Sequence, residues 1–187
     1  MLQILIKANE NYSLGEMAQM AVEAGAGWIV VSAGEEGREA MTDIATMCRE
    51  AGIMLSIEND YTTARELGLH GVFVTDNAIS PVSLREELGP EAIIGALTGS
   101  PDAAASLARA DIDYVSLDSA VSDPETFIST LRNAGCEIPV VAYRPGLALD
   151  AAIVGGLLSH GFSGICGADR AFDEADPVAA LENLLKD

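Results

Sequence analysis

The feature that most constrains the fold is a repeat in which a short apolar run is followed by a helical stretch, about every 23 residues. The run occurs eight times, at Ile4–Ile6, Trp28–Val31, Ile53–Ile57, Gly71–Val74, Ala92–Ala96, Tyr114–Leu117, Ile138–Ala142 and Gly164–Cys166. Short β-branched runs that alternate with helices predict a parallel sheet. Eight such units are the number that closes a (β/α)8 barrel.

Helix signals between the runs support this repeat. We predict helices at 14–24, 36–51, 61–67, 81–88, 101–109, 123–134, 147–159 and 175–186. Ser13 and Glu16 form a capping-box pattern at the start of the first helix. A capping residue precedes proline at three further starts, Ser80-Pro81, Ser100-Pro101 and Asp123-Pro124. Glycine, which favours a left-handed C-cap, follows five of the helices, at Gly25, Gly52, Gly68, Gly135 and Gly161.

The apolar runs are continuous rather than alternating, which is typical of parallel strands covered by helices. An open doubly wound sheet would also alternate strands with helices, but no GxGxxG follows the first run and the units are even in length. We therefore predict an α/β fold, a compact (β/α)8 TIM barrel forming one domain over residues 1–187. The active site of such a barrel lies at the C-terminal ends of the strands.

The chain is strongly acidic, with 29 Asp and Glu against 10 Lys and Arg and a net charge of −19. This charge repels phosphate backbones, so we expect neither nucleic acid nor an anionic membrane as a partner. A solvated acidic surface explains the charge, with salt adaptation as the alternative. The three cysteines have no CxxC spacing and no secretory signal precedes the first run, so we expect a cytoplasmic protein with structural thiols. A homodimer is left open.

Three cationic side chains follow predicted strands that are neighbours in a closed barrel. Lys7 follows the first run, Arg144 the seventh and Arg170 the eighth, whereas the other cations, Arg38 among them, lie in predicted helices or at the C-terminus. Barrels often bind phosphate beside strands seven and eight, so we predict an anion site there. The alternative is internal pairing, for example of Arg144 or Arg170 with Asp169. Hydroxyl side chains after the fifth and sixth runs complete the predicted phosphate-binding set: Thr98, Ser100 and Ser119.

Acidic and amide side chains gather after the third and fourth runs. Glu58, Asn59 and Asp60 follow the third run, and Asp76 follows the fourth. Converging carboxylates with few cations nearby suit Mg²⁺, which keeps part of its water shell. We predict these four residues as metal ligands. The alternative is that Asp60 caps the next helix and Asp76 opens a turn.

Neither histidine is a candidate for the site. His70 and His160 both precede predicted strands, which places them at the N-terminal face of the barrel, where residues serve stability. The carboxyl end therefore has no imidazole for acid–base chemistry. Lys7 is the lysine that a Schiff-base mechanism would have to use.

Several segments in the middle of the chain resemble the thiamine phosphate synthase family and its thiazole tautomerase relatives. Leu88–Ser100 reads LGPEAIIGALTGS and is followed by Asp113-Tyr114-Val115, and the family has LGPxAIIGxSTHS leading to GADYVxxG. Ala51–Ile57 and Leu67–Val72 are similar to the family's AGVPLIINDRVDLALALGADGVHLG. Ile138–Ala142 resembles the strand before its glycine-rich phosphate loop. The resemblance covers roughly residues 12–187.

The resemblance implies a barrel that joins an aminopyrimidine pyrophosphate to a thiazole phosphate, with Mg²⁺ on the pyrophosphate. The family's Asn-Asp pair corresponds to Glu58-Asn59, or to Asn59-Asp60 with a one-residue slip. Its basic strand-two motif QLREK corresponds to Val30–Gly34, which holds no cation. Its strand-six loop PTxTK is replaced by Asp118-Ser119-Ala120, and its phosphate loop after strand eight by Gly167–Arg170.

Two classes of function follow. The first is a divergent thiamine phosphate synthase-like transferase that acts on a Mg²⁺-pyrophosphate or a phosphorylated heterocycle in thiamine biosynthesis. The second is a catalytically inactive barrel that binds a phosphorylated small molecule or a protein partner. The missing strand-two cations and strand-six loop favour the second class, and the cations at strands seven, eight and one favour anion binding.

Overall fold

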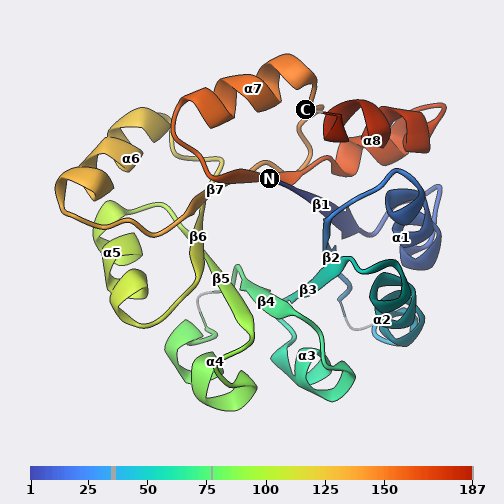
Figure 1. Cartoon of the computed structure of the whole chain (residues 1–187), viewed down its shortest axis with the longest axis horizontal. Coiled ribbons are helices and arrows are strands. Elements are labelled where there is room, and N and C mark those ends of the chain that lie inside the picture. Colours follow the sequence, from blue (N-terminus) through green and yellow to red (C-terminus); the bar gives the residue numbers. More distant parts are fainter. Residues whose placement is uncertain (35–36, 77, 187) are drawn as a thin grey trace.

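The computed structural model describes residues 1–34, 37–76 and 78–186, and shows a closed barrel of parallel strands (Figure 1). The strands are β1 (Leu2–Lys7), β2 (Trp28–Ser32), β3 (Met54–Glu58), β4 (Gly71–Val74), β5 (Ile93–Thr98), β6 (Tyr114–Leu117), β7 (Val140–Tyr143) and β8 (Gly164–Gly167). Each strand pairs with the next in sequence, and β1 closes the barrel by pairing with β8, where Gln3 lies opposite Cys166. The predicted (β/α)8 TIM barrel is confirmed.

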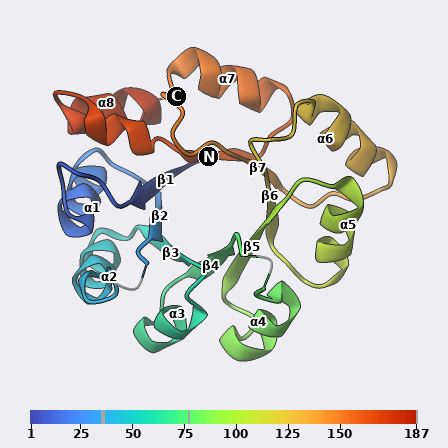
Figure 2. The same cartoon turned by 180° about the vertical axis from the view of Figure 1, so that it is seen from behind.

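Helices form a ring around the strands, seen from both sides in Figures 1 and 2. They are α1 (Leu14–Glu23), α2 (Ala40–Ala51), α3 (Tyr61–Leu67), α4 (Pro81–Leu88), α5 (Pro101–Arg109), α6 (Pro124–Asn133), α7 (Ala151–Ser159) and α8 (Pro177–Leu185), with a 3-10 helix η1 (Asp169–Asp173) before α8. Within the described part of the chain, no helix has the length and hydropathy that a membrane crossing requires.

The predicted helix signals act as expected. Ser13 and Glu16 form both hydrogen bonds of a capping box, and the three Ser-Pro or Asp-Pro pairs each cap the helix that follows them. The five predicted C-cap glycines all have positive φ. Three predicted starts were too early by two to four residues, those of α2, α7 and α8, and α8 begins at Pro177 rather than at 175. Residues 35–36 lie outside the described residues and α2 begins at Ala40, whereas α7 begins at Ala151 because the carboxylate of Asp150 accepts the amide hydrogen of Ile153 at 2.8 Å.

Alternate residues of each strand face either the barrel interior or the helices. The interior cluster consists of Leu5, Trp28, Val30, Phe73, Tyr114, Val141 and Cys166. Its aromatic rings contact one another: the Tyr114 ring stacks on Phe73 with centroids 6.2 Å apart and meets Trp28 edge-on at 5.8 Å. The barrel interior is therefore a packed core, and any binding site has to lie above it.

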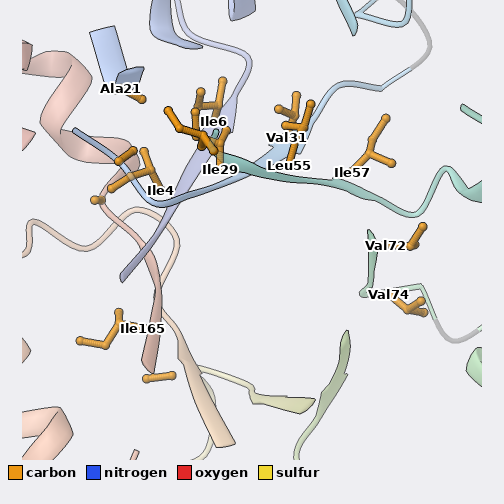
Figure 3. Packing of buried hydrophobic residues seen from close by; sticks show 14 of the residues in the cluster. Ile4, Ile6, Ala21, Ile29, Val31, Leu55, Ile57, Val72, Val74 and Ile165 are labelled. Atoms are coloured by element: carbon orange, nitrogen blue, oxygen red, sulfur yellow. The ribbon is translucent and has the colours of Figure 1, made fainter. Parts of the chain in front are cut away.

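A larger core fills the space between the strands and the helices. Figure 3 shows part of it, with Ile4 and Ile6 of β1, Ile29 of β2 and Leu55 of β3 all fully buried, and Ala21 of α1 close to them. These side chains are the other half of the strand alternation. Since both faces of each strand are buried, continuous apolar runs are what this fold requires.

Candidate functional site

The strand alternation brings polar side chains to the mouth of the barrel at the carboxyl end. Leu5, Phe73 and Val141 belong to the interior cluster, so the residue two positions further along each strand faces the same interior. Applied to β1–β4, β6 and β7, this rule places six polar side chains above the aromatic layer: Lys7, Ser32, Glu58, Thr75, Asp118 and Tyr143. The mouth thus combines one ammonium group, two carboxylates and three hydroxyls.

A hydrogen-bond network ties the end of β3 to the end of β4. The Thr75 hydroxyl donates to Glu58 Oε1 at 2.5 Å, and Asn59 Nδ2 donates to Thr75 Oγ1 at 2.7 Å. Asn59 Oδ1 accepts the backbone amides of Thr75 at 2.8 Å and Asp76 at 3.0 Å. Asn59 itself has a left-handed backbone with φ of 58°, which asparagine tolerates better than most residues. The network fixes the direction of the Glu58 carboxylate.

The predicted metal ligands are largely occupied by bonds within the protein. Both oxygens of Asp60 accept hydrogens from Thr63, the backbone amide at 2.9 Å and the hydroxyl at 2.6 Å, which makes Asp60 the N-cap of α3. Asp76 Oδ1 accepts the amide of Ala78 at 2.8 Å in a turn. Across the residues that the structure describes, no group of three His, Cys, Asp or Glu side chains could hold a metal ion. A cation cage built from protein ligands alone is therefore not assembled here.

Arg38 is a cation at the mouth that the sequence reasoning missed. We predicted it to lie in a helix, but α2 begins two residues later and Arg38 sits in the loop after β2. It lines a cavity of about 520 Å³ together with Ala33, Gly34, Ile57, Glu58, Asn59 and Asp60. Its guanidinium lies 3.9 Å from Asp60 and 3.6 Å from Glu66, and all three side chains are partly exposed. Such long, exposed pairs hold a charge weakly, so Arg38 can turn to a bound anion.

Two of the three predicted strand-end cations are paired inside the protein. Lys7 Nζ lies 2.6 Å from Asp169 Oδ2, and Arg170 Nη1 lies 3.0 Å from Asp173 Oδ2. The same groups border a cavity of about 400 Å³ above β8 and β1. Each of these two cations thus has a carboxylate partner within the protein, but the partners differ from the expected ones: Asp169 pairs with Lys7 and not with Arg144 or Arg170.

Arg144 behaves differently from the other two. Its Nη1 donates to the carbonyl of Tyr143 at 2.8 Å, and none of the ion pairs found among the described residues includes it. Burial lowers the pKa of the Arg144 guanidinium from its usual value, and the nearby charge of Asp118 opposes that shift. A guanidinium stays charged under these conditions. Arg144 is thus a half-buried cation beside the mouth.

The predicted hydroxyl ligands do not join this cation cluster. Ser100 Oγ accepts the amide of Ala103 at 3.4 Å as the N-cap of α5, and Thr98 Oγ1 bonds to Ser100 at 3.3 Å. Both line a separate cavity of about 590 Å³ that also includes apolar side chains of α5, such as Leu107. Ser119 is exposed after β6. Their placement favours structural roles at the β5 and β6 ends.

The histidines and cysteines offer no nucleophile or base to the mouth. His70 Nδ1 accepts the amide of Leu55 at 3.1 Å, and His160 Nε2 lies 2.9 Å from Glu125. Burial raises the pKa of the Cys48 thiol to about 11, and Cys166 is fully buried in the barrel interior with its pKa raised further by the same cause. Proton transfer by imidazole and attack by a thiolate are both unsupported by this arrangement.

Comparison with known proteins finds similar sequences. A family model described as thiamine monophosphate synthase matches residues 3–122, which include Arg38 and the β3–β4 network. The thiamine-phosphate synthase of Bacteroides fragilis is 26% identical over 98% of both chains, and that of Natronomonas pharaonis is 28% identical over 60% of this chain and 58% of its own.

Solved structures show the same fold. Thiamine phosphate pyrophosphorylase from Pyrococcus furiosus superimposes with a TM-score of 0.81 at 19% identity, covering 99% of this chain and 93% of the other. A native KDPGal structure reaches a TM-score of 0.78 at 10% identity, covering 99% and 92%. At these identities the likeness concerns the fold alone. The match to the family model spans more than half of the sequence, and the chain therefore belongs to the thiamine monophosphate synthase family.

Proposed function

We propose that this protein is a transferase of thiamine biosynthesis that joins a heterocyclic nitrogen to a carbon carried on a Mg²⁺-diphosphate. The observation that carries the proposal is the cavity above β2 and β3, where Arg38 faces Glu58 and Asn59. The family's strand-two motif QLREK has no cationic counterpart in Val30–Gly34, and Arg38 returns a cation to the same strand end. Family membership supplies the reaction class.

The residues present fit magnesium only as an ion shared with the substrate. The Asn59 amide is used up by Thr75 and Asp76, and Asp60 caps a helix. Within the described residues, Glu58 accepts a hydrogen bond at Oε1 and Asp76 at Oδ1, which leaves one carboxylate oxygen on each. Mg²⁺ is commonly held by one or two carboxylates plus substrate phosphates. Bound this way, the ion would neutralise charge on the diphosphate.

The residues of the mouth are suited to stabilising a leaving group rather than to moving protons. In the transfer, the bond between carbon and diphosphate oxygen breaks, the electron pair leaves with diphosphate, and the ring nitrogen forms the new bond to carbon. Negative charge grows on the departing diphosphate, so a cation that contacts it lowers the barrier. Arg38 supplies such a charge next to the network that holds Glu58, and the step requires no histidine.

A second function is favoured by one specific observation. Lys7 and Arg170, two of the cations expected to meet a phosphate, are already paired with Asp169 and Asp173. A barrel that has lost catalysis and only binds a phosphorylated ligand or a protein partner would tolerate this. Such a protein would bind diphosphate, or a partner, without forming any new carbon–nitrogen bond.

Replacing Arg38 tests the diphosphate site. We expect Arg38→Met to weaken inorganic diphosphate binding in the presence of Mg²⁺ at least tenfold, about 1.4 kcal/mol, because one contact between opposite charges is lost. Isothermal titration calorimetry with and without Mg²⁺ measures this. Arg109→Met is the matched control, since Arg109 is exposed on α5 and its removal changes the net charge equally. Equal diphosphate affinity of Arg38→Met and Arg109→Met would show that the diphosphate does not contact Arg38.

A further inference from the structure

The carboxylate of Asp169 lies beside the ends of β7 and β8, where many barrels bind the phosphate of a ligand. Its side chain is only 3% exposed, and it receives Lys7 Nζ at 2.6 Å. The backbone amide of Gly146 donates to both of its oxygens, at 2.9 Å and 3.0 Å. Gly146 belongs to the loop after β7, Asp169 to the segment after β8, and Lys7 ends β1. Loops after strands seven and eight are where barrels frequently hold a phosphate.

The backbone around Asp169 is shaped to hold this carboxylate. Ala168 is buried and has a left-handed conformation with φ of 66°, which costs about 1–2 kcal/mol in a non-glycine residue. A side chain at Gly167 would come within 2.9 Å of the carbonyl oxygen of Arg144, so the β7 and β8 ends approach closely. Strained residues persist where their surroundings hold them in place. Asp169 is therefore fixed under the loop rather than free to swing out.

The charges of the adjoining cavity also disfavour a phosphate. Its charged lining residues are two cations, Lys7 and Arg170, and three acids, Glu10, Asp169 and Asp173. A phosphate at this position would have to displace a buried carboxylate that already has a charge-assisted hydrogen bond and two amide contacts. Repulsion between like charges is a common way for a site to reject a ligand.

We infer that Asp169 is a specificity-determining residue, a built-in anion that closes the phosphate position above β7, β8 and β1. The group accepted in this cavity then carries a neutral hydroxyl or an amine rather than a phosphate. This rests on the proposed function only in treating the cavity as the subsite of the heterocyclic acceptor. Any phosphate that the acceptor carries would then have to lie outside this cavity, and the diphosphate of the other substrate binds above β2 and β3.

The test uses inorganic phosphate as the probe and the full-length protein. Asp169→Ser removes the carboxylate and opens the amide of Gly146 and the ammonium of Lys7. We expect this variant to bind phosphate at least tenfold more tightly than the wild type, by calorimetry at constant ionic strength. Adding Lys7→Met to Asp169→Ser should abolish the gain in phosphate affinity. Asp173→Ser is the matched control, because it removes one negative charge from the same cavity and leaves Asp169 in place.

Two results would overturn the inference: phosphate binding by the wild type that depends on Lys7, or an equal gain in Asp173→Ser. Should Asp169→Ser lose its cooperative thermal transition, the amide resonance of Gly146 in the wild type decides instead. The chemical shift of this resonance stays constant during a phosphate titration if the Asp169 carboxylate keeps its place, and it changes if phosphate binds to the Gly146 amide. Neither phosphate binding nor the Gly146 resonance depends on turnover. A failure of the proposed transfer reaction therefore leaves this inference standing, and a failure of this inference leaves the transfer reaction standing.

Discussion

Gly95→Ala is expected to destabilise the protein by about 3 kcal/mol, at the upper end of what overpacking a core costs. Gly95 lies in β5, and an added Cβ would come within 2.1 Å of Cζ of Tyr114 and 2.4 Å of its hydroxyl oxygen. The Tyr114 ring cannot move aside, because it is buried between Trp28 and Phe73. Urea unfolding followed by circular dichroism measures the loss.

Two further variants separate overpacking from a general effect of removing glycine. Gly155→Ala lies in helix α7 with no atom within 4 Å of the added Cβ, so we expect a gain of about 0.5–1 kcal/mol from higher helix propensity. The double variant Gly95→Ala with Tyr114→Leu should lose less free energy of unfolding than the sum of the two single losses, because leucine leaves room for the added Cβ. Additive losses would show that the contact with Tyr114 is not the cause.

Arg85→Ala is expected to cost about 3 kcal/mol, at the upper end for losing a charged hydrogen-bond donor whose acceptors are left unpaired, and the ion pair itself adds little because the Asp113 side chain is 44% exposed. The Arg85 side chain of α4 is 14% exposed and lies 2.7 Å from the carboxylate of Asp113. Its guanidinium also donates to the carbonyls of Gly89 at 3.0 Å and Ala92 at 2.6 Å, and to that of Asp111 at 3.0 Å. Removing Arg85 leaves carbonyls around the start of β5 without a donor.

Arg65→Ala is the matched control for this prediction. Arg65 of α3 forms an ion pair of the same length with Glu87, 2.7 Å, but both side chains are about half exposed, 53% and 50%. Exposed pairs contribute up to about 1 kcal/mol. Arg85→Lys should recover only part of the stability, since an ammonium group lacks the planar fork that reaches several carbonyls. Equal losses for Arg65→Ala and Arg85→Ala would contradict the structural role assigned to Arg85.

The fold could be predicted from the sequence because its signals are local and repeated. The runs at Gly71–Val74 and Tyr114–Leu117 are strands with the predicted bounds, and capping residues marked most helix starts correctly. The early start assigned to α7 has a physical reason: Leu147 and Leu149 extend its apolar pattern toward the N-terminus, while the Asp150 cap sets the first turn. A capping residue outweighs hydropathy at a helix end.

The site was less accessible to sequence reasoning because pairing in space decides what each residue does. Lys7 was correctly placed at the mouth, but its 2.6 Å contact with Asp169 joins residues at opposite ends of the chain. Arg38 was assigned to a helix, although Gly34 and Gly37 shortly before it were a signal that the helix starts later. Asp60 and Asp76 serve as the helix cap and turn residue that the sequence offered as alternatives to metal ligation.

The most direct test of the account is whether the folded protein catalyses the transfer itself. The wild type would be incubated with an aminopyrimidine diphosphate, Mg²⁺ and either a phosphorylated or a hydroxyl-bearing thiazole, with diphosphate release and the coupled product measured together. We expect one diphosphate released for each carbon–nitrogen bond formed, and a lower kcat/KM in Arg38→Met than in Arg109→Met. Folded protein that releases no diphosphate with either the hydroxyl-bearing or the phosphorylated thiazole would contradict the proposed transfer.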